Sequence, residues 1–191
     1  MKSSEILDLL EWSGAILKGH FRLTSGKHSN QYIEKFRLLE NPIALDKICS
    51  TMAGNYKGEK IDLVVSAAVG GILIAGGVGR YLNVKHIFSE RINGKMDLKR
   101  GFNIEKGQNI LIVEDIVTTG GSINELIDLV ESYEGNILGI LSIVDRNDKM
   151  KIFKYPYDTL LNFPVQSWKE GDCPECIKNV KITKPGSTGK K

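Results

Sequence analysis

Residues 110–122, with the sequence Ile-Leu-Ile-Val-Glu-Asp-Ile-Val-Thr-Thr-Gly-Gly-Ser, constrain the fold more than any other part of the chain. Residues 110–113 form a short apolar run without alternation, which is typical of a strand covered on both faces in a parallel sheet. Apolar residues then recur at helical spacing over 123–130, and Ser122 is a candidate N-cap for that helix. The sequence therefore predicts a buried strand, a loop of small residues and a helix.

The loop of this unit combines two kinds of chemistry. Hydroxyl groups, glycines and the free N–H groups of a helix start suit a phosphate group, and they come from residues 118–122. Glu114 and Asp115 would repel a phosphate but suit the hydroxyls of a sugar or a hard metal ion. The alternative is a plain turn with solvated acids, which is unfavourable because acids at the end of a buried strand are costly without a partner. We expect a site for a phosphorylated sugar.

These thirteen residues resemble the phosphoribosyl pyrophosphate signature of the phosphoribosyltransferase family, position for position. Two rival phosphate motifs, the P-loop and the dinucleotide-binding glycine motif, do not occur in the chain. The resemblance implies the type I phosphoribosyltransferase fold, an α/β fold whose parallel sheet is covered by helices on both faces, with a small N-terminal cap. It implies that phosphoribosyl pyrophosphate is bound by Glu114, Asp115, Ile116, Val117, Thr118, Thr119, Gly120, Gly121 and Ser122.

The rest of the chain alternates strands with helices, which also favours a doubly covered parallel sheet. The expected helices span residues 4–17, 42–56, 72–82 and 122–133. The expected strands span 61–66, 84–90, 110–113, 137–144 and 159–163, with short strands about a turn at 25–27. We expect a single domain over 1–191, in which 1–36 form a cap or hood, 37–165 the core and 166–191 a C-terminal appendage.

Two further loops follow predicted strands. The small-residue turn 67–71 offers backbone N–H groups to a second anionic group, unless it is packed for shape only; the resemblance assigns it to the pyrophosphate and its magnesium. Segment 91–106 is basic, and we interpret it as a mobile lid rather than a solvated charged loop. Its Arg91 and Lys95 would bind the leaving pyrophosphate, while Asp115 would stabilise the cationic sugar. These three residues are the predicted catalytic set.

More of the chain resembles the orotate phosphoribosyltransferases. Residues 19–29 are similar to an N-terminal stretch of that family that lies near the base. The family's Val-Asp-Arg is present at 144–146, and the resemblance implies that Arg146 and Thr118 contact orotate. It also implies a homodimer in which each lid completes the neighbour's active site. From the residues alone, Arg146 has the alternative of a salt bridge with a nearby aspartate.

Three positions depart from the family pattern. Many members carry lysine where Thr24 and Gly70 stand, and a lid histidine where Asp97 stands. A carboxylate-bearing base would lose cationic partners at these positions. The candidates to replace them are Lys27, Lys35 and Arg37. We expect Lys27 to contact orotate.

The sequence thus predicts transfer of ribose 5-phosphate from phosphoribosyl pyrophosphate to orotate in pyrimidine (UMP) synthesis. Mg²⁺ is expected as cofactor, carried mainly by the pyrophosphate and sugar hydroxyls, with no protein ligand. One alternative is a purine phosphoribosyltransferase, which would need a different base pocket. The other is a non-catalytic regulator of the same fold. Such a regulator would need a DNA-binding segment, and we expect no room for one before residue 36.

Composition favours a cytoplasmic enzyme without nucleic-acid or membrane partners. The net charge of the 191 residues is only +3, and no apolar stretch approaches the roughly 20 residues of a membrane span. We expect no signal peptide, and we expect the basic tail from residue 178 to be solvated. Three cysteines do not form a disulfide framework.

The pair Cys173 and Cys176 has the spacing of half a zinc site. An inert turn or a redox-sensitive pair is favoured over a four-thiolate site shared by two protomers. Cys49 is expected in the core, and the histidines at 20, 28 and 86 show no ligand spacing.

Overall fold

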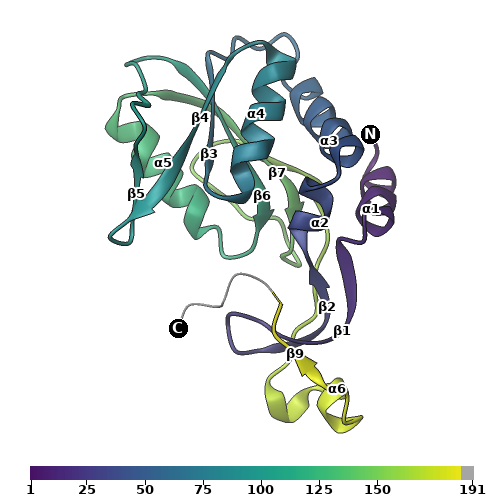
Figure 1. Cartoon of the computed structure of the whole chain (residues 1–191). Coiled ribbons are helices and arrows are strands. Elements are labelled where there is room, and N and C mark those ends of the chain that lie inside the picture. The colour runs from purple at the N-terminus through teal and green to yellow at the C-terminus, as the bar shows by residue number, and fades with distance from the viewer. Residues whose placement is uncertain (186–191) are drawn as a thin grey trace.

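The computed structural model describes residues 1–185, and its centre is a six-stranded sheet with the strand order β5-β4-β3-β6-β7-β8 (Figure 1). Strands β3, β4, β6, β7 and β8 are parallel, while β5 pairs antiparallel with β4 at one edge. The strand bounds are β3 Leu63–Ala67, β4 Lys85–Ile92, β5 Lys95–Leu98, β6 Asn109–Val117, β7 Asn136–Asp145 and β8 Tyr157–Asn162. The expected α/β fold is confirmed, with one antiparallel strand added.

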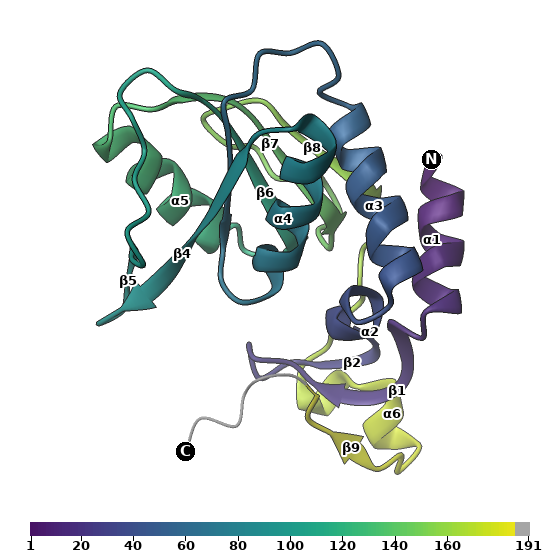
Figure 2. The same ribbon diagram turned by 45° about the horizontal axis from the view of Figure 1, so that its top comes forward.

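Helices cover both faces of this sheet (Figure 2). The helix bounds are α1 Ser3–Trp12, α2 Lys35–Leu39, α3 Pro42–Gly54, α4 Gly70–Leu82 and α5 Gly121–Ser132. Helices α1 to α4 pack into one hydrophobic cluster, and α5 packs into a second cluster on the opposite face. Within β6, Leu111 and Val113 belong to the first cluster and Ile110 and Ile112 to the second. This burial on both faces explains why the strand is apolar without alternation.

The first helix is shorter than the sequence predicts. It ends at Trp12, and Gly14 follows with φ of +71°, a conformation that favours glycine. Ile16 and Leu17, which were expected in the helix, instead begin strand β1 and pair with Ile33 and Tyr32. Cross-strand pairing therefore outweighs the helical spacing of these apolar residues.

Two local predictions in the core are also wrong. The N-cap of α5 is Gly120 rather than Ser122, because the chain turns at Gly120 with φ of +81°. The basic segment after residue 90 is not a free loop over its whole length, since β4 continues to Ile92 and returns as β5 through a turn at Asn93 and Gly94. This basic hairpin forms one edge of the sheet.

A second, smaller sheet lies away from the core and has the strand order β2-β1-β9 (Figures 1 and 2). Its strands are β1 Ile16–Arg22, β2 His28–Ile33 and β9 Ile182–Thr183, and the short helices η1 Glu170–Asp172 and α6 Pro174–Ile177 lie beside it. We call residues 16–33 and 166–185 the hood. Helix α1, expected in the cap, packs on the core through Ile6, Leu9 and Leu10.

None of the helices within residues 1–185 is both long enough and apolar enough to span a membrane.

Candidate functional site

The two acids of the signature lie inside β6, close to its carboxyl end. Glu114 and Asp115 are 7% and 4% exposed, so both carboxylates are almost removed from solvent. Glu114 accepts a hydrogen bond from the Asp115 N–H, and Asp115 accepts one from the Ile116 N–H. Burial, together with the neighbouring Asp115 charge, raises the pKa of Glu114 above its usual range. Two adjacent buried acids concentrate negative charge at this strand end.

The loop after β6 leads into the start of α5. Thr118 and Thr119 are exposed, and Gly120 holds the left-handed turn at the N-cap. A side chain at Gly120 would also meet the ring of Phe153, since its Cβ would lie 2.9 Å from a ring carbon. The first turn of α5 presents N–H groups without intrahelical partners, which makes an anion site. The loop and the start of α5 thus bring the residues predicted for the phosphate together at one helix end.

Lys35 forms an ion pair with the buried Asp115. The Nζ to Oδ2 distance is 2.6 Å, and Lys35 comes from the first turn of α2. The same Nζ lies 3.1 Å from the place that a Cβ would take at Gly70. A side chain at Gly70 would also collide with the Asp115 carboxylate as it stands. Lys35 thus brings a cation to the position where many family members place a lysine at residue 70.

A cavity of about 490 Å³ opens beside these charges. It is lined by Tyr32, Ile33, Glu34, Lys35, Phe36, Asp115, Ile116, Thr118 and Arg146. The cavity therefore combines residues from the signature, from β2 and α2, and from the end of β7. Its volume suits a small molecule of the size of a sugar phosphate with a base.

Arg146 reaches this cavity with an unsatisfied donor. Its Nε is buried and has no hydrogen-bond partner among the described residues, and burial lowers the pKa of the guanidinium. The alternative salt bridge does not form within residues 1–185. Asp145 instead accepts hydrogen bonds from Asn147, from the Lys151 N–H and from the Tyr157 hydroxyl. A half-buried guanidinium whose Nε is buried and unpaired beside a cavity indicates an anionic or imide ligand.

The turn 67–71 joins β3 to α4 next to the same acids. Helix α4 begins at Gly70, two residues earlier than expected, and the peptide between Ala68 and Val69 is cis. The side chain of Val69 is 69% exposed, so the turn faces solvent. The start of α4 adds a second set of free N–H groups near Asp115.

The basic hairpin lies on the other side of the signature helix. Arg91 donates to Glu125 at 2.7 Å and approaches the Ser122 hydroxyl at 3.5 Å, so it is next to the phosphate loop. Lys95 lies on β5 beside Glu125 and Asp128, away from the cavity around Arg146. Within one chain, Lys95 and Asp115 do not line the same cavity.

Two residues considered at the base pocket lie elsewhere. Thr24 and Lys27 are exposed at the tip of the β1–β2 hairpin and do not line the cavity. Tyr32 and Glu34 do line it, although no sequence pattern singles out Glu34. Lys35 was one of three candidates to replace the lysines that are missing from the family pattern. Nothing in the sequence distinguished it from Lys27.

Comparison with known proteins agrees with this geometry. The family model of the phosphoribosyl transferase domain matches residues 37–174. An orotate phosphoribosyltransferase from Thermoanaerobacter sp. (strain X514) is 42% identical over 187 residues, covering 98% of this chain and 98% of its own. The chain therefore belongs to the phosphoribosyltransferase family, within the group of orotate phosphoribosyltransferases.

Solved structures show how widely the fold is shared. The orotate phosphoribosyltransferase of Aeropyrum pernix superposes with a TM-score of 0.67 at 22% identity, over 82% of this chain and 93% of that one. The adenine phosphoribosyltransferase of Saccharomyces cerevisiae superposes with a TM-score of 0.65, also at 22% identity, over 83% of this chain and 99% of that one. The fold alone therefore does not select the base.

Proposed function

We propose that the protein transfers ribose 5-phosphate from phosphoribosyl pyrophosphate to N1 of orotate, releasing pyrophosphate and orotidine 5′-phosphate. The observation that carries this proposal is the buried, unpaired Nε of Arg146 in a cavity that also contains Asp115 and Thr118. One wall of this cavity suits a phosphorylated sugar, and the other suits an anionic base. A purine would offer no carboxylate to such a guanidinium.

Different groups of residues bind different parts of the two substrates. The N–H groups and hydroxyls of residues 118–122 bind the 5′-phosphate, and Glu114 and Asp115 bind the ribose hydroxyls. The turn at 67–71 receives the pyrophosphate end of the substrate. Arg146 donates to orotate, and Thr118 lies between the base and the phosphate. The ligands thus gather outside the carboxyl ends of the parallel strands, as in other open α/β sheets.

The reaction requires no protein nucleophile. The C1–O bond to pyrophosphate breaks with its electron pair leaving on pyrophosphate, the C1–N1 bond to orotate forms, and the N1 proton is lost. As the sugar becomes cationic, the buried carboxylate of Asp115 stabilises it electrostatically, while Glu114, whose pKa is raised by burial, binds a ribose hydroxyl. Orotate N1 is acidic, so little general-base catalysis is needed.

The donor set at the site fits a magnesium ion that arrives with the substrate. Mg²⁺ prefers oxygen ligands and is usually held by one or two carboxylates together with substrate phosphates. Asp115 lies on the cavity wall with the required oxygen atoms, and the signature supplies no soft ligand. When bound, Mg²⁺ would neutralise charge on the pyrophosphate.

Lys35 is the cation that we propose in place of the family's lysine at residue 70. Its Nζ already occupies the space beside Gly70 and contacts Asp115. Lys35→Ala should lower kcat/KM, and Lys35→Arg, which keeps the positive charge beside Asp115, should retain a large part of it. Arg37→Ala, at an exposed residue two positions along α2, is the matched control and should leave kcat/KM near the wild-type value. A kcat/KM for Lys35→Arg as low as that of Lys35→Ala would contradict this role of the Lys35 charge.

We also propose a cytoplasmic homodimer in which Lys95 acts on the partner's site. In one chain Lys95 does not line the cavity around Arg146, so a lid contributed by a partner would supply the missing cation. Lys95→Ala should lower kcat strongly, whereas the midpoint of thermal unfolding should change little. Mixing Lys95→Ala with Asp115→Asn protomers should restore activity, because a hybrid dimer contains one site with both residues intact. An unchanged rate for Lys95→Ala would eliminate the lid role.

The function is tested by following orotate absorbance with phosphoribosyl pyrophosphate and Mg²⁺, beside adenine, guanine, hypoxanthine, xanthine and uracil. Consumption of orotate alone is the expected result. Turnover of a purine would overturn the base assignment, and binding of phosphoribosyl pyrophosphate without any turnover would favour the regulator.

A further inference from the structure

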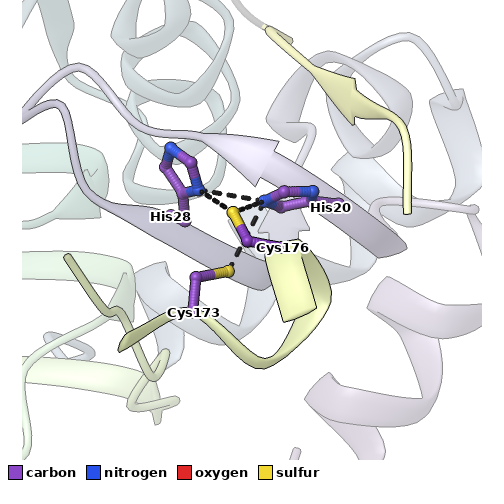
Figure 3. A group of neighbouring side chains, drawn as sticks. All are labelled: His20, His28, Cys173 and Cys176. Carbon is purple, nitrogen blue, oxygen red and sulfur yellow. Dashed lines mark hydrogen bonds between the residues drawn. The ribbon is translucent and has the colours of Figure 1, made fainter. Parts of the chain in front are cut away.

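Four side chains that can bind metal converge in the hood, far from the phosphate loop along the chain. His20 comes from β1, His28 begins β2, Cys173 is the N-cap of α6 and Cys176 lies within α6 (Figure 3). One possible ligand atom from each lies within 4.8 Å of all the others. His20, His28 and Cys173 are buried, and Cys176 is half-buried. No local spacing marks these histidines as ligands, because about 150 residues of chain separate the histidine pair from the cysteine pair.

The distances fit a tetrahedral zinc site. With Zn–S about 2.3 Å and Zn–N about 2.0–2.1 Å, tetrahedral ligand atoms lie about 3.3–3.8 Å apart. His20 Nε2 is 3.5 Å from Cys173 Sγ and 3.6 Å from Cys176 Sγ. His28 Nδ1 is 3.2 Å from Cys176 Sγ and 3.0 Å from His20 Nε2. The two distances from His20 to sulfur already lie in this range, and the two from His28 need to open by only a few tenths of an ångström around a central ion.

The orientation of His20 is that of a metal ligand. Its Nδ1 lies 2.7 Å from the Val180 carbonyl oxygen, which can only accept a hydrogen bond. Nδ1 therefore carries the proton, and Nε2 directs its lone pair into the cluster. A metal-bound histidine usually donates its second N–H to such a carbonyl.

Hydrogen bonding alone does not account for this cluster. Three atoms approach His20 Nε2 within 3.6 Å, namely His28 Nδ1 and the sulfurs of Cys173 and Cys176. A neutral imidazole nitrogen has one lone pair and accepts one well-aligned hydrogen bond. A cation at the centre would satisfy all four groups at once.

The C-terminal part of the hood also lacks a core that could hold it in place. Among residues 164–185, Cys173 alone is fully buried, and Ile177 and Ile182 are 75% and 40% exposed. The segment is attached to the β1–β2 hairpin by the short β9 pairing and by polar contacts, including two hydrogen bonds between His28 and Trp168 and the hydrogen bonds from Ser29 to Gln166 and from Thr183 to His20. Small units with so little apolar burial generally depend on a disulfide or a metal ion.

We propose that His20, His28, Cys173 and Cys176 of one chain bind a structural Zn²⁺ ion that joins the C-terminal segment to the β1–β2 hairpin. A closed set of four N and S ligands is typical of structural rather than catalytic zinc. The site differs from the shared four-thiolate site considered from the sequence, since all four ligands come from one protomer. Because β2 continues to Tyr32 and Ile33 in the cavity wall, the ion also fixes one wall of the base pocket.

The first test measures metal in tag-free full-length protein purified with a reductant and without a chelator. Mass spectrometry of the metals should find about one zinc per chain in the wild type. Cys176→Ser and His28→Asn should each lose most of it. His86→Gln, at an exposed histidine, and Cys49→Ala, at a buried cysteine outside the cluster, are the matched controls and should keep it.

The second test does not depend on how well the variants fold. Wild-type protein stripped of metal should bind one Co²⁺ and give the visible bands of tetrahedral cobalt with a thiolate-to-cobalt charge-transfer band, both displaced by Zn²⁺. Metal removal should also accelerate proteolysis within residues 164–185 by roughly tenfold or more, while the core remains intact. A wild-type protein that carries no zinc and gives no tetrahedral cobalt spectrum would overturn the proposal, as would a disulfide between Cys173 and Cys176 under these conditions.

Discussion

The core sheet and the hood are stabilised in different ways. The core has two hydrophobic clusters, one on each face of a six-stranded sheet, and strands such as β6 are buried on both sides. The hood has a three-stranded sheet with few buried apolar residues and a group of histidine and cysteine side chains at its centre. Apolar burial surrounds the acidic pair Glu114 and Asp115 in the core, whereas the hood depends on a small number of polar groups.

The base cavity lies where these two regions meet. Its signature residues come from the end of β6, and Tyr32 and Ile33 come from the end of β2. Changes on the signature side of the cavity should therefore act mainly on the phosphorylated sugar, and changes on the side with Arg146 and Tyr32 should act mainly on the base.

Asp115→Asn should cause the largest effect. It removes the buried negative charge beside the sugar and weakens the contact with Lys35, so we expect kcat/KM to fall about 100- to 1000-fold, the range typical for loss of one electrostatic contact in the transition state. Steady-state kinetics against both substrates measures this. Asp128→Asn, at an exposed residue of α5, is the control. A loss of less than about tenfold would contradict the role of Asp115.

Leu111→Ala in the core and Ile182→Ala in the hood compare how much buried apolar side chains stabilise the two regions. Leu111 is fully buried in β6, so its truncation should cost about 3 kcal/mol, within the range for buried leucines. Ile182→Ala, in the exposed strand β9, should cost about 0.5 kcal/mol or less. Urea unfolding of both variants gives the comparison. Equal costs would mean that the hood is packed like the core.

Arg146→Gln should act on the base side of the cavity. Loss of a charged hydrogen bond is worth about 1.5–3 kcal/mol, so the KM for orotate should rise roughly 10- to 100-fold. The KM for phosphoribosyl pyrophosphate should stay nearly constant, because Arg146 is not part of the phosphate loop. Arg37→Gln, at an exposed arginine of α2, serves as control. A parallel rise in both KM values would contradict the assignment of Arg146 to the base.

The same division explains what the sequence could predict. The apolar run before Glu114 and the glycines after it are local signals, so the core strands, the phosphate loop and the buried acids could be located from the sequence. The pairing of Lys35 with Asp115, and of His20 with Cys173, joins residues 80 and 153 positions apart. Such contacts depend on tertiary packing, which no local periodicity encodes. The early end of the first helix was missed for the same reason, since Ile16 and Leu17 are held in strand β1 by their pairing with β2.

Glu114→Gln should have the smallest effect, and it depends on pH. Burial and the Asp115 charge raise the pKa of Glu114 in the folded protein, so the folded state holds this proton over a pH range in which the unfolded state has lost it. Stability therefore falls as pH rises from the ordinary carboxyl range through the raised pKa of the folded state. The glutamine has no proton to lose, so the difference in thermal midpoint between Glu114→Gln and the wild type should shift in favour of the variant as pH rises. Glu105→Gln, at an exposed glutamate, should show no such trend. If the difference in thermal midpoint between Glu114→Gln and the wild type stays constant with pH, the pKa of Glu114 is the same in the folded and unfolded chains. The core would then tolerate both charges of the acidic pair.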